Sequence, residues 1–271
     1  MNLAQALAAG GIEPREARLL LAEATGLSAA AVLAHGEREL AEAAKARYLE
    51  MVARRREGEP IAYILGRREF YGLSLAVGPA VLIPRPETER LVELALERLP
   101  LEADTIVADL GTGCGAIALA IKKHRPRARL VAIDESVAAL EVAARNATQH
   151  ALAVDWRHGR WFEATPRERF DLIVANPPYV AAGDPHLSMG DVRFEPPGAL
   201  IAGSDGLDAI RAIVRDAPAF LREGTWLLLE HGGTQDAAVR AMLLDAGLAD
   251  VATWPDLAAI ARVSGGKLKS D

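Results

Sequence analysis

From Thr105 onward, short apolar runs of strand length alternate with longer segments of helical periodicity. We predict strands at residues 105–109, 129–133, 154–157, 170–175 and 225–230, and helices at 115–124, 136–150, 207–221 and 235–246. This alternation is typical of βαβ units, whose consecutive strands run parallel. We therefore expect an α/β fold with a mostly parallel sheet and a ligand site at the carboxyl ends of its strands.

The amino-terminal segment, residues 1–57, has helical spacing throughout and is rich in Ala, Leu, Glu and Arg. Pro14 can open one helix, Ser28 can cap another, and residues 39–56 predict a longer one. Helices this short are not stable alone, so we expect a small bundle. Alternation in Phe70–Val77 predicts a β-hairpin. The predicted parts are residues 1–75, the helical part with its hairpin connector, and residues 76–271.

The tetrapeptide Asn176-Pro177-Pro178-Tyr179 directly follows the predicted strand 170–175. Two consecutive prolines end both a helix and a strand ladder, so a rigid loop is expected there. The loop would lie at the carboxyl end of a strand, where open α/β sheets bind ligands. A stiff surface turn is the alternative interpretation.

A glycine-rich loop, Asp109-Leu110-Gly111-Thr112-Gly113-Cys114-Gly115, joins the first predicted strand to its helix. Glycines at alternate positions let the backbone turn sharply and approach a ligand. Asp134 ends the next strand, where a carboxylate can accept hydrogen bonds from both hydroxyls of a ribose. These features predict an adenosine-bearing cofactor. S-adenosylmethionine is favoured, and a dinucleotide or a turn that only packs the helix on the strand are the alternatives.

Several classes of site and protein are disfavoured. Cys114 is the single cysteine, so no disulfide or cysteine-based zinc site is expected, and a small residue filling a tight loop is favoured over a nucleophile. The histidines have no metal-binding spacing, so no metal is predicted. The net charge of −6 argues against direct nucleic-acid binding. Without a signal peptide or membrane span in the sequence, we expect a cytoplasmic protein.

The tetrapeptide is suited to methylation of a planar amino group. An amide nitrogen is a poor nucleophile and must be held with its lone pair facing the methyl donor. The carbonyl groups of Asn176 and Pro177 could accept both hydrogens of one NH₂ group, and Tyr179 could stack on its plane. We expect positioning and electrostatics to drive the reaction, with no general base before methyl transfer.

On these residues the chain resembles class I S-adenosylmethionine methyltransferases that act on planar amino groups. From about Gly58 to Gly247 it resembles the bacterial release-factor glutamine methyltransferases, the HemK/PrmC family. The supporting segments are Gly58–Ile64, Leu82–Glu89, Asp184–Leu187, Gly190–Pro196 and Leu228–Gly232. The resemblance implies a Rossmann-like class I methyltransferase fold with a small amino-terminal helical domain that helps to bind the release factor.

The resemblance also implies the reaction, methylation of the side-chain amide nitrogen of the glutamine in the Gly-Gly-Gln motif of peptide chain release factors. The implied catalytic residues are Asn176, Pro177 and Tyr179. The implied cofactor-binding residues are Asp109, Gly111, Thr112, Gly113, Cys114, Gly115, Asp134, Trp161 and Asn176. The implied substrate-binding residues are Asn176, Pro177, Pro178, Tyr179 and Arg85. Trp161 would lie against the adenine, and Arg160 replaces the acid that relatives usually carry before it.

Other interpretations remain open from the sequence. They are a glutamine methyltransferase for a ribosomal protein, an adenine amino methyltransferase for nucleic acid, and an inactive module that binds the cofactor or a partner. Arg85 with Glu87 and Glu89 could equally mark a helix start. The segment 180–206 is too long for an ordinary connection and predicts a loop that covers the substrate. After Val263 we expect no strand and poor order.

Overall fold

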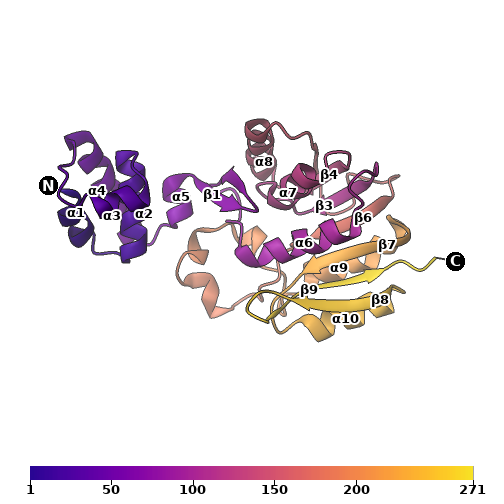
Figure 1. The fold of residues 1–271 in the computed structure, drawn as a ribbon. Helices are drawn as coiled ribbons and strands as arrows, with labels where there is room; N and C mark the ends of the chain where they lie inside the picture. The colour runs from indigo at the N-terminus through magenta and orange to yellow at the C-terminus, as the bar shows by residue number, and fades with distance from the viewer. Residues whose placement is uncertain (271) are drawn as a thin grey trace. The chain divides into compact units, whose positions relative to one another are not determined.

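The computed structural model of the chain describes residues 1–270, which form two compact units (Figure 1). The smaller unit comprises Met1–Arg67 and the segment Ser188–Phe194, and the larger comprises Arg68–Leu187 and the chain from Glu195 onward. Among residues 1–270, no helix is both long and apolar enough to cross a membrane. The proposed division at residue 75 stays a prediction.

The smaller unit is a helical bundle. Its helices are α1 (Leu3–Ala9), α2 (Pro14–Thr25), α3 (Ala29–Ala34), α4 (Glu42–Arg56) and α5 (Ile61–Leu65). Pro14 opens α2 and Ser28 caps α3, as predicted. The predicted start of α4 at Glu39 was wrong, because Leu40 donates its backbone N–H to Met1 and Glu39 forms an isolated β-bridge with Asn2.

Buried leucines and Tyr48 hold this bundle together. Leu20 and Leu21 of α2 are fully buried with Tyr48 of α4, whose hydroxyl donates to the carbonyl of Ala6 at 3.1 Å. Asp191, from the segment after the tetrapeptide, accepts a hydrogen bond from Arg55 of α4 at 2.7 Å. The bundle therefore contains a distant part of the chain as well as its own helices.

The larger unit begins with the predicted hairpin, β1 (Arg67–Phe70) and β2 (Leu73–Ala76), although the first residue of β1 belongs to the smaller unit. A short 3-10 helix η1 (Pro86–Thr88) leads into α6 (Glu89–Arg98), so the interpretation of Arg85 and the following acids as a helix start was correct.

A seven-stranded sheet follows, in the order β5-β4-β3-β6-β7-β9-β8. The strands are β3 (Ile106–Leu110), β4 (Arg129–Asp134), β5 (Asp155–His158), β6 (Phe170–Ala175), β7 (Leu221–Glu230), β8 (Ala249–Pro255) and β9 (Ala261–Lys267). The first five pair in parallel, as predicted, and β9 runs antiparallel to both β7 and β8. The expectation of a mostly parallel α/β sheet is confirmed.

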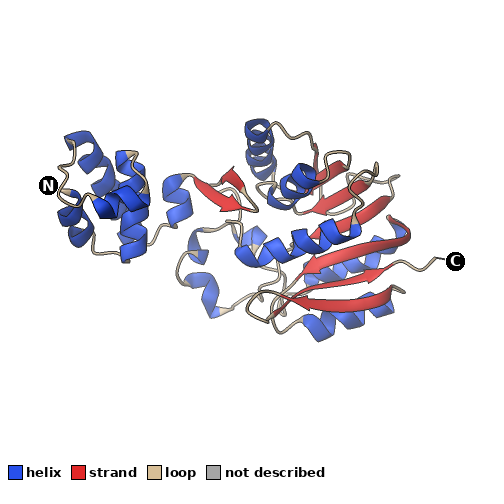
Figure 2. Cartoon of the chain, viewed as in Figure 1, coloured by secondary structure: helices blue, strands red, loops and turns tan. Residues whose placement is uncertain are grey.

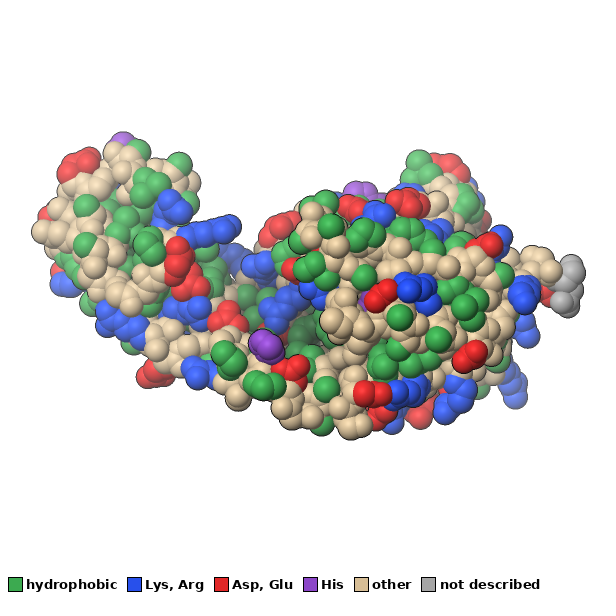
Figure 3. All heavy atoms as spheres, turned by 90° about the horizontal axis from the view of Figure 1, so that it is seen from below, with side chains coloured by type: hydrophobic (Ala, Val, Ile, Leu, Met, Phe, Trp, Pro, Cys, Tyr) green, Lys and Arg blue, Asp and Glu red, His purple; other side chains and the backbone are tan. Residues whose placement is uncertain are grey.

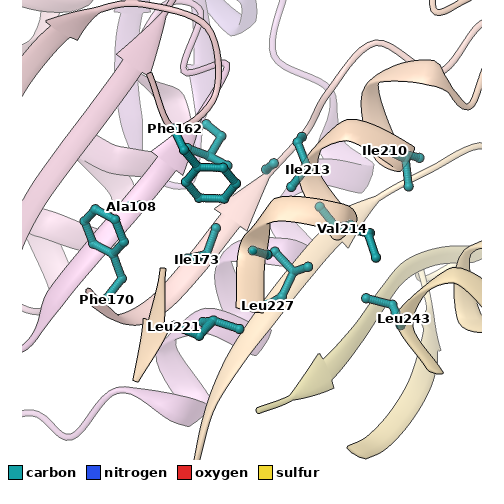
Figure 4. Close-up of a cluster of buried hydrophobic side chains, with 14 of the residues drawn as sticks. Ala108, Phe162, Phe170, Ile173, Ile210, Ile213, Val214, Leu221, Leu227 and Leu243 are labelled. Carbon is teal, nitrogen blue, oxygen red and sulfur yellow. The ribbon is translucent and has the colours of Figure 1, made fainter. Parts of the chain in front are cut away.

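Helices cover both faces of this sheet (Figures 1 and 2). Besides α6, the larger unit contains α7 (Ala116–His124), α8 (Val137–His150), α9 (Asp208–Asp216) and α10 (Asp236–Asp245). The apolar face of α9 presents Ile210, Ile213 and Val214 to Ile173 of β6 and Leu227 of β7 (Figure 4). All five side chains are at most 2% exposed, so this face anchors the centre of the sheet.

The expectation for the end of the chain was wrong. Ser264, Gly265 and Gly266 lie within β9, between β7 and β8. Glycine has low strand propensity, so the sequence pattern did not indicate a strand here. Here glycine is needed because a Cβ on Gly265 would lie 2.6 Å from the carbonyl oxygen of Leu227. Tertiary pairing on both edges therefore orders a segment whose composition suggested a tail.

The predicted helix 207–221 was too long. The helix α9 ends at Asp216, and a 3-10 turn η5 (Ala217–Ala219) follows. Pro218 has no N–H to donate and cannot continue the helix. The chain then enters β7 at Leu221, four residues before the predicted start at Thr225.

We predict that Gly265→Ala destabilises the larger unit by about 1–3 kcal/mol, because the added methyl group would force the backbone of β7 or β9 to shift. Gly78→Ala is the matched control, since a Cβ there meets no atom within 4 Å. Urea unfolding monitored by tryptophan fluorescence measures both. Equal midpoints for the two variants would contradict the close approach at Gly265.

Candidate functional site

Three loops meet at the carboxyl edge of the sheet. Leu110, the last residue of β3, is paired with Ile133 of β4 on one side and with Ala175 of β6 on the other. The chain continues from β3 to β4 and β5 in one direction, and from β6 to β7 in the other. Loops diverge at such a switch point and leave a crevice for a ligand. The glycine loop, Asp134 and the tetrapeptide border this crevice.

The glycine loop folds back onto β4. The backbone N–H groups of Gly111 and Thr112 both donate to the carbonyl of Ile133, at 2.8 and 3.0 Å. Gly111 and Gly113 have φ of 72° and 57°, in the left-handed region that favours glycine. A Cβ on Gly113 would meet no protein atom within 4 Å, so open space lies beside the loop there.

Asp109 supports the glycine loop from beneath. Its Oδ2 accepts hydrogen bonds from the Thr112 hydroxyl at 2.6 Å and from the N–H of Ala118 at 3.2 Å. The side chain is fully buried, and this burial raises the pKa of Asp109 to about 7 against the effect of those two hydrogen bonds. Its Oδ1 has no hydrogen-bond partner within the described chain.

Each carboxylate oxygen of Asp134 accepts one hydrogen bond from the backbone of the protein. One oxygen accepts from the N–H of Gly113 at 2.8 Å and the other from the N–H of Ser136 at 2.9 Å. Burial raises the pKa of Asp134, and these two hydrogen bonds oppose the rise. Each carboxylate oxygen has two lone pairs, so each can accept a further hydrogen bond from a ligand.

Trp161 closes the side of the crevice next to the glycine loop. A Cβ on Gly111 would lie 3.4 Å from its ring. Its backbone has a φ of 50°, and its indole Nε1 is buried without a hydrogen-bond partner in residues 1–270. Arg160 holds its guanidinium 6.0 Å from the ring centre and 3.9 Å from the carboxylate of Glu135. The side chain before Trp161 is therefore cationic, and Glu135 is the nearby acid.

Asn176 is fixed by a residue of η1. Its Nδ2 donates to the Thr88 hydroxyl at 3.1 Å. Glu230, at the end of β7, fixes the other end of the tetrapeptide. The Tyr179 hydroxyl donates to Oε1 of Glu230 at 3.2 Å. Complete burial raises the pKa of Glu230 to about 7, and the hydrogen bond from Tyr179 opposes that rise. Burial also raises the pKa of Tyr179.

A cavity of about 370 Å³ opens between these loops. Of the predicted site residues, it is lined by Gly111, Gly113, Asp134, Trp161, Asn176 and Pro178. The remaining predicted residues do not line it: Asp109, Thr112, Cys114 and Gly115 belong to the loop beneath, Pro177 and Tyr179 to the tetrapeptide, and Arg85 to the segment before η1.

The segment 180–206 contributes a wall of this cavity, formed by Pro196, Gly198, Ala199, Ile201, Ala202 and Gly203. The buried carboxylate of Glu195 anchors this segment. It accepts a hydrogen bond from the N–H of Ile83 at 3.0 Å and forms an ion pair with Arg85. Arg85 therefore holds the loop in this structure, and its predicted contact with the substrate stays a prediction. A substrate-covering role of the loop also stays a prediction.

Sequence reasoning missed Thr88, Glu195 and Glu230 as parts of the site. Glu230 had a signal: it is an acid that ends the apolar run of β7, as Asp134 ends β4. Thr88 and Glu195 had none, because their partners lie 88 and 110 residues away in the chain.

Cys114 is buried in the glycine loop. Burial raises the pKa of its thiol to about 12, which keeps it protonated near neutral pH. Its backbone carbonyl accepts a hydrogen bond from Nδ2 of Asn146 at 2.9 Å. These contacts fit the interpretation of Cys114 as a small residue that fills the loop.

Comparison with known families matches both units. Residues 2–66 match the PrmC N-terminal domain, and residues 89–194 match the methyltransferase small domain. Among solved structures, a T. thermophilus 16S rRNA methyltransferase in complex with AdoMet and guanosine has a TM-score of 0.57 and 23% identity, over 75% of this chain and 50% of that one. This likeness shows the fold, which is that of the class I methyltransferases.

Curated relatives match almost the whole chain. The release factor glutamine methyltransferase of Xylella fastidiosa (strain Temecula1) is 54% identical over 257 residues, which cover 94% of either protein. The protein of the same name from Burkholderia pseudomallei is 50% identical, over 98% of this chain and 95% of its own.

We predict that Cys114 is inert in the native protein. With a pKa of about 12, its thiol is ionised in about one molecule in ten thousand at pH 8. Ellman's reagent should therefore label almost no thiol in native buffer and one thiol per chain in guanidinium chloride. Rapid labelling of the folded chain would contradict the burial of this loop.

Proposed function

Because the chain belongs to the family of release factor glutamine methyltransferases, we propose that it transfers a methyl group from S-adenosylmethionine to the side-chain amide nitrogen of the glutamine in the Gly-Gly-Gln motif of peptide chain release factors. It is a protein-glutamine N-methyltransferase. The observation that carries the proposal is the placement of Asn176. Its Nδ2 is bound to Thr88, so its carbonyl oxygen is the group left for a ligand in the cavity that the glycine loop also lines.

The cavity fits S-adenosylmethionine in several respects. Its volume of about 370 Å³ lies within the range of small-molecule sites. Gly113 leaves open space for the amino-acid portion of the ligand, and the carboxylate of Asp134 has acceptor positions free for two ribose hydroxyls. Trp161 offers its ring to the adenine, while Asp109, Thr112, Cys114 and Gly115 shape the loop from behind.

Arg160 changes the polar edge of the proposed adenine pocket. Its charge lies near Glu135, which also lines the cavity. We propose that the Glu135 carboxylate accepts a hydrogen bond from the adenine amino group. It would take the place of the acid that relatives usually carry at the position of Arg160. The pair is exposed to solvent, so its own attraction is weak and leaves Glu135 free to bind a ligand.

S-adenosylmethionine supplies an activated methyl group on a sulfonium centre. The chain supplies orientation: the carbonyl oxygens of Asn176 and Pro177 accept the two N–H groups of the substrate amide. Those hydrogen bonds hold the amide in place and raise the electron density on its nitrogen. Tyr179, whose hydroxyl is fixed by Glu230, offers its ring to the plane of the amide.

Other acceptors have less support from the structure. On the face of the larger unit shown in Figure 3, acidic and basic side chains are intermixed, whereas a protein that follows a phosphate backbone gathers its basic residues. The tetrapeptide and its hydrogen bonds are intact, as turnover requires and as an inactive binding module does not. A cytoplasmic location remains part of the proposal, since the substrate is a translation factor.

Methylation of purified release factor tests the proposal directly. We expect label from S-adenosyl[methyl-³H]methionine to enter the wild-type factor and not a variant whose motif glutamine is alanine. Ribosomal proteins, DNA and RNA serve as competing acceptors in parallel reactions. Equal label in the factor and its variant, label in neither, or label in a competing acceptor alone would reject the assignment.

Asn176→Ala should raise the activation free energy by about 2–4 kcal/mol, the scale of one preorganised polar contact in a transition state. Affinity for S-adenosylmethionine should stay nearly unchanged, because Asn176 is one of many residues around the cavity. Single-turnover rates and isothermal titration calorimetry measure the two effects separately. Wild-type turnover in this variant would remove Asn176 from the reaction.

A further inference from the structure

Gln235, which caps the start of α10, joins three loops through its side-chain amide. Its Oε1 accepts a hydrogen bond from the N–H of Gly232 at 2.8 Å, and its Nε2 donates to the carbonyl of Tyr179 at 3.0 Å. The same Nε2 lies 3.3 and 3.4 Å from the carbonyl oxygens of Asp205 and Gly206. These partners belong to the loop after β7, to the tetrapeptide, and to the end of the segment that follows the tetrapeptide.

The partners of this amide allow only one of its two flip states. A backbone N–H faces its oxygen, and backbone carbonyl groups face its nitrogen. In the flipped state two donors would meet at Gly232, and two acceptors would meet at Tyr179. The two N–H groups of Gln235 are therefore shared among three carbonyl groups, and Gln235 acts as a donor between the tetrapeptide and the end of the following segment.

The segment that Gln235 holds also forms the cavity wall, the wall that residues 196–203 contribute to the cavity. The N–H of Val180 donates to the carbonyl of Leu200 at 2.8 Å, and the N–H of Ala202 donates to the carbonyl of Val180 at 3.0 Å. Val180 and Ile201 thereby form a parallel bridge. The backbone that leaves the tetrapeptide is thus paired with the cavity wall, and Gln235 joins the two strands of chain at the end of this pairing.

Gly206 shows how closely these two stretches of backbone approach each other. Its φ of 76° lies in the left-handed region that favours glycine. A Cβ at this position would clash with the carbonyl oxygen of Tyr179 and would lie 2.9 Å from Nε2 of Gln235. The contact therefore has no room for a side chain, and any group that widens it must move the end of the segment away from the tetrapeptide.

We propose that Gln235 is a positioning residue that holds the cavity wall against the tetrapeptide and so keeps the substrate amide within reach of Asn176. Gln235 itself does not line the cavity, whereas Asn176, Ile201 and Ala202 do. The proposal rests on the function proposed above and extends it to a residue outside the cavity. A wall that moves by about 1 Å would leave the amide poorly oriented, and misplacement on that scale lowers rates strongly.

Gln235→Glu removes the donor with little change in shape. The carboxylate can still accept the N–H of Gly232, but its other oxygen would face the carbonyl of Tyr179. We expect kcat for release-factor methylation to fall by about tenfold to a hundredfold. Affinity for S-adenosylmethionine, measured by calorimetry, should stay nearly unchanged, because other hydrogen bonds hold the glycine loop and Asp134. Loss of the fold would lower both quantities, so their separation identifies a positioning role.

Gln149→Glu is the matched control. Gln149 lies on α8 and is exposed, and its Nε2 donates to the carbonyl of Ser74 at 3.0 Å. The chemical change is the same as at Gln235, and it also removes a hydrogen bond to a backbone carbonyl. We expect wild-type kcat in this variant.

Gly206→Ala alters the same contact from its opposite side. The added methyl group would push the end of the segment away from the carbonyl of Tyr179 while Gln235 keeps its amide. We expect kcat to fall in this variant as in Gln235→Glu, with affinity for S-adenosylmethionine again nearly unchanged.

Hydrogen–deuterium exchange follows the cavity wall without any turnover. The N–H groups of Val180 and Ala202 should exchange faster in Gln235→Glu and in Gly206→Ala than in the wild type and in Gln149→Glu, because their pairing opens more often. The N–H groups of β6 and β7 should keep their protection in every variant. This pattern separates a local opening of the wall from a loss of stability of the whole unit.

Wild-type kcat in Gln235→Glu would overturn the proposal, as would unchanged exchange at Val180 and Ala202. Faster exchange throughout the sheet together with lost cofactor affinity would give Gln235 a role in stability alone and would also overturn it. If the wild-type enzyme fails to methylate the release factor, the proposed function fails. The exchange data then still decide whether Gln235 holds the cavity wall.

Discussion

The parallel pairing of β3 with β6 is the constraint on which the site depends. Leu110 opposes Ala175, so the glycine loop and the tetrapeptide leave the sheet side by side although 65 residues separate these partners. A register shift of one residue would turn every side chain of β6 to the opposite face. Ile173 packs against α9, and residues 172–175 of β6 are all buried, so packing on the sheet fixes this register and thereby determines where Asn176 lies.

Buried carboxylates hold both loops at this edge. Asp109 accepts hydrogen bonds from Thr112 and Ala118 beneath the glycine loop, and Glu230 accepts one from Tyr179 behind the tetrapeptide. Burial of a carboxyl group is unfavourable unless hydrogen bonds compensate for the lost water, and in both cases it raises the pKa to about 7. The fold thus accepts a local cost in stability to obtain loops with one conformation.

The predictable parts of this chain were those encoded by neighbouring residues. The tetrapeptide, the glycine loop and Asp134 each follow an apolar strand, so local pattern placed them at one edge of the sheet. The strand β9 was not predictable in this way, because its glycines favour it only through contact with β7 and β8. Thr88 was not predictable for the same reason: it contacts Asn176, which lies 88 residues away and which only the folded chain brings to it.

A methyl transfer that needs no general base leaves orientation as the main task of the protein. Asparagine alone is a poor device for this task, since its amide has two nearly isosteric flip states with opposite hydrogen-bonding character. A rigid Pro177-Pro178 backbone fixes the position of Asn176 but not its flip state. The hydrogen bond from its Nδ2 to the Thr88 hydroxyl holds the amide with its carbonyl oxygen free for a ligand. The buried acid at the end of β7 acts on the other end of the tetrapeptide, where its carboxylate accepts the hydrogen bond from the Tyr179 hydroxyl, although it does not line the cavity.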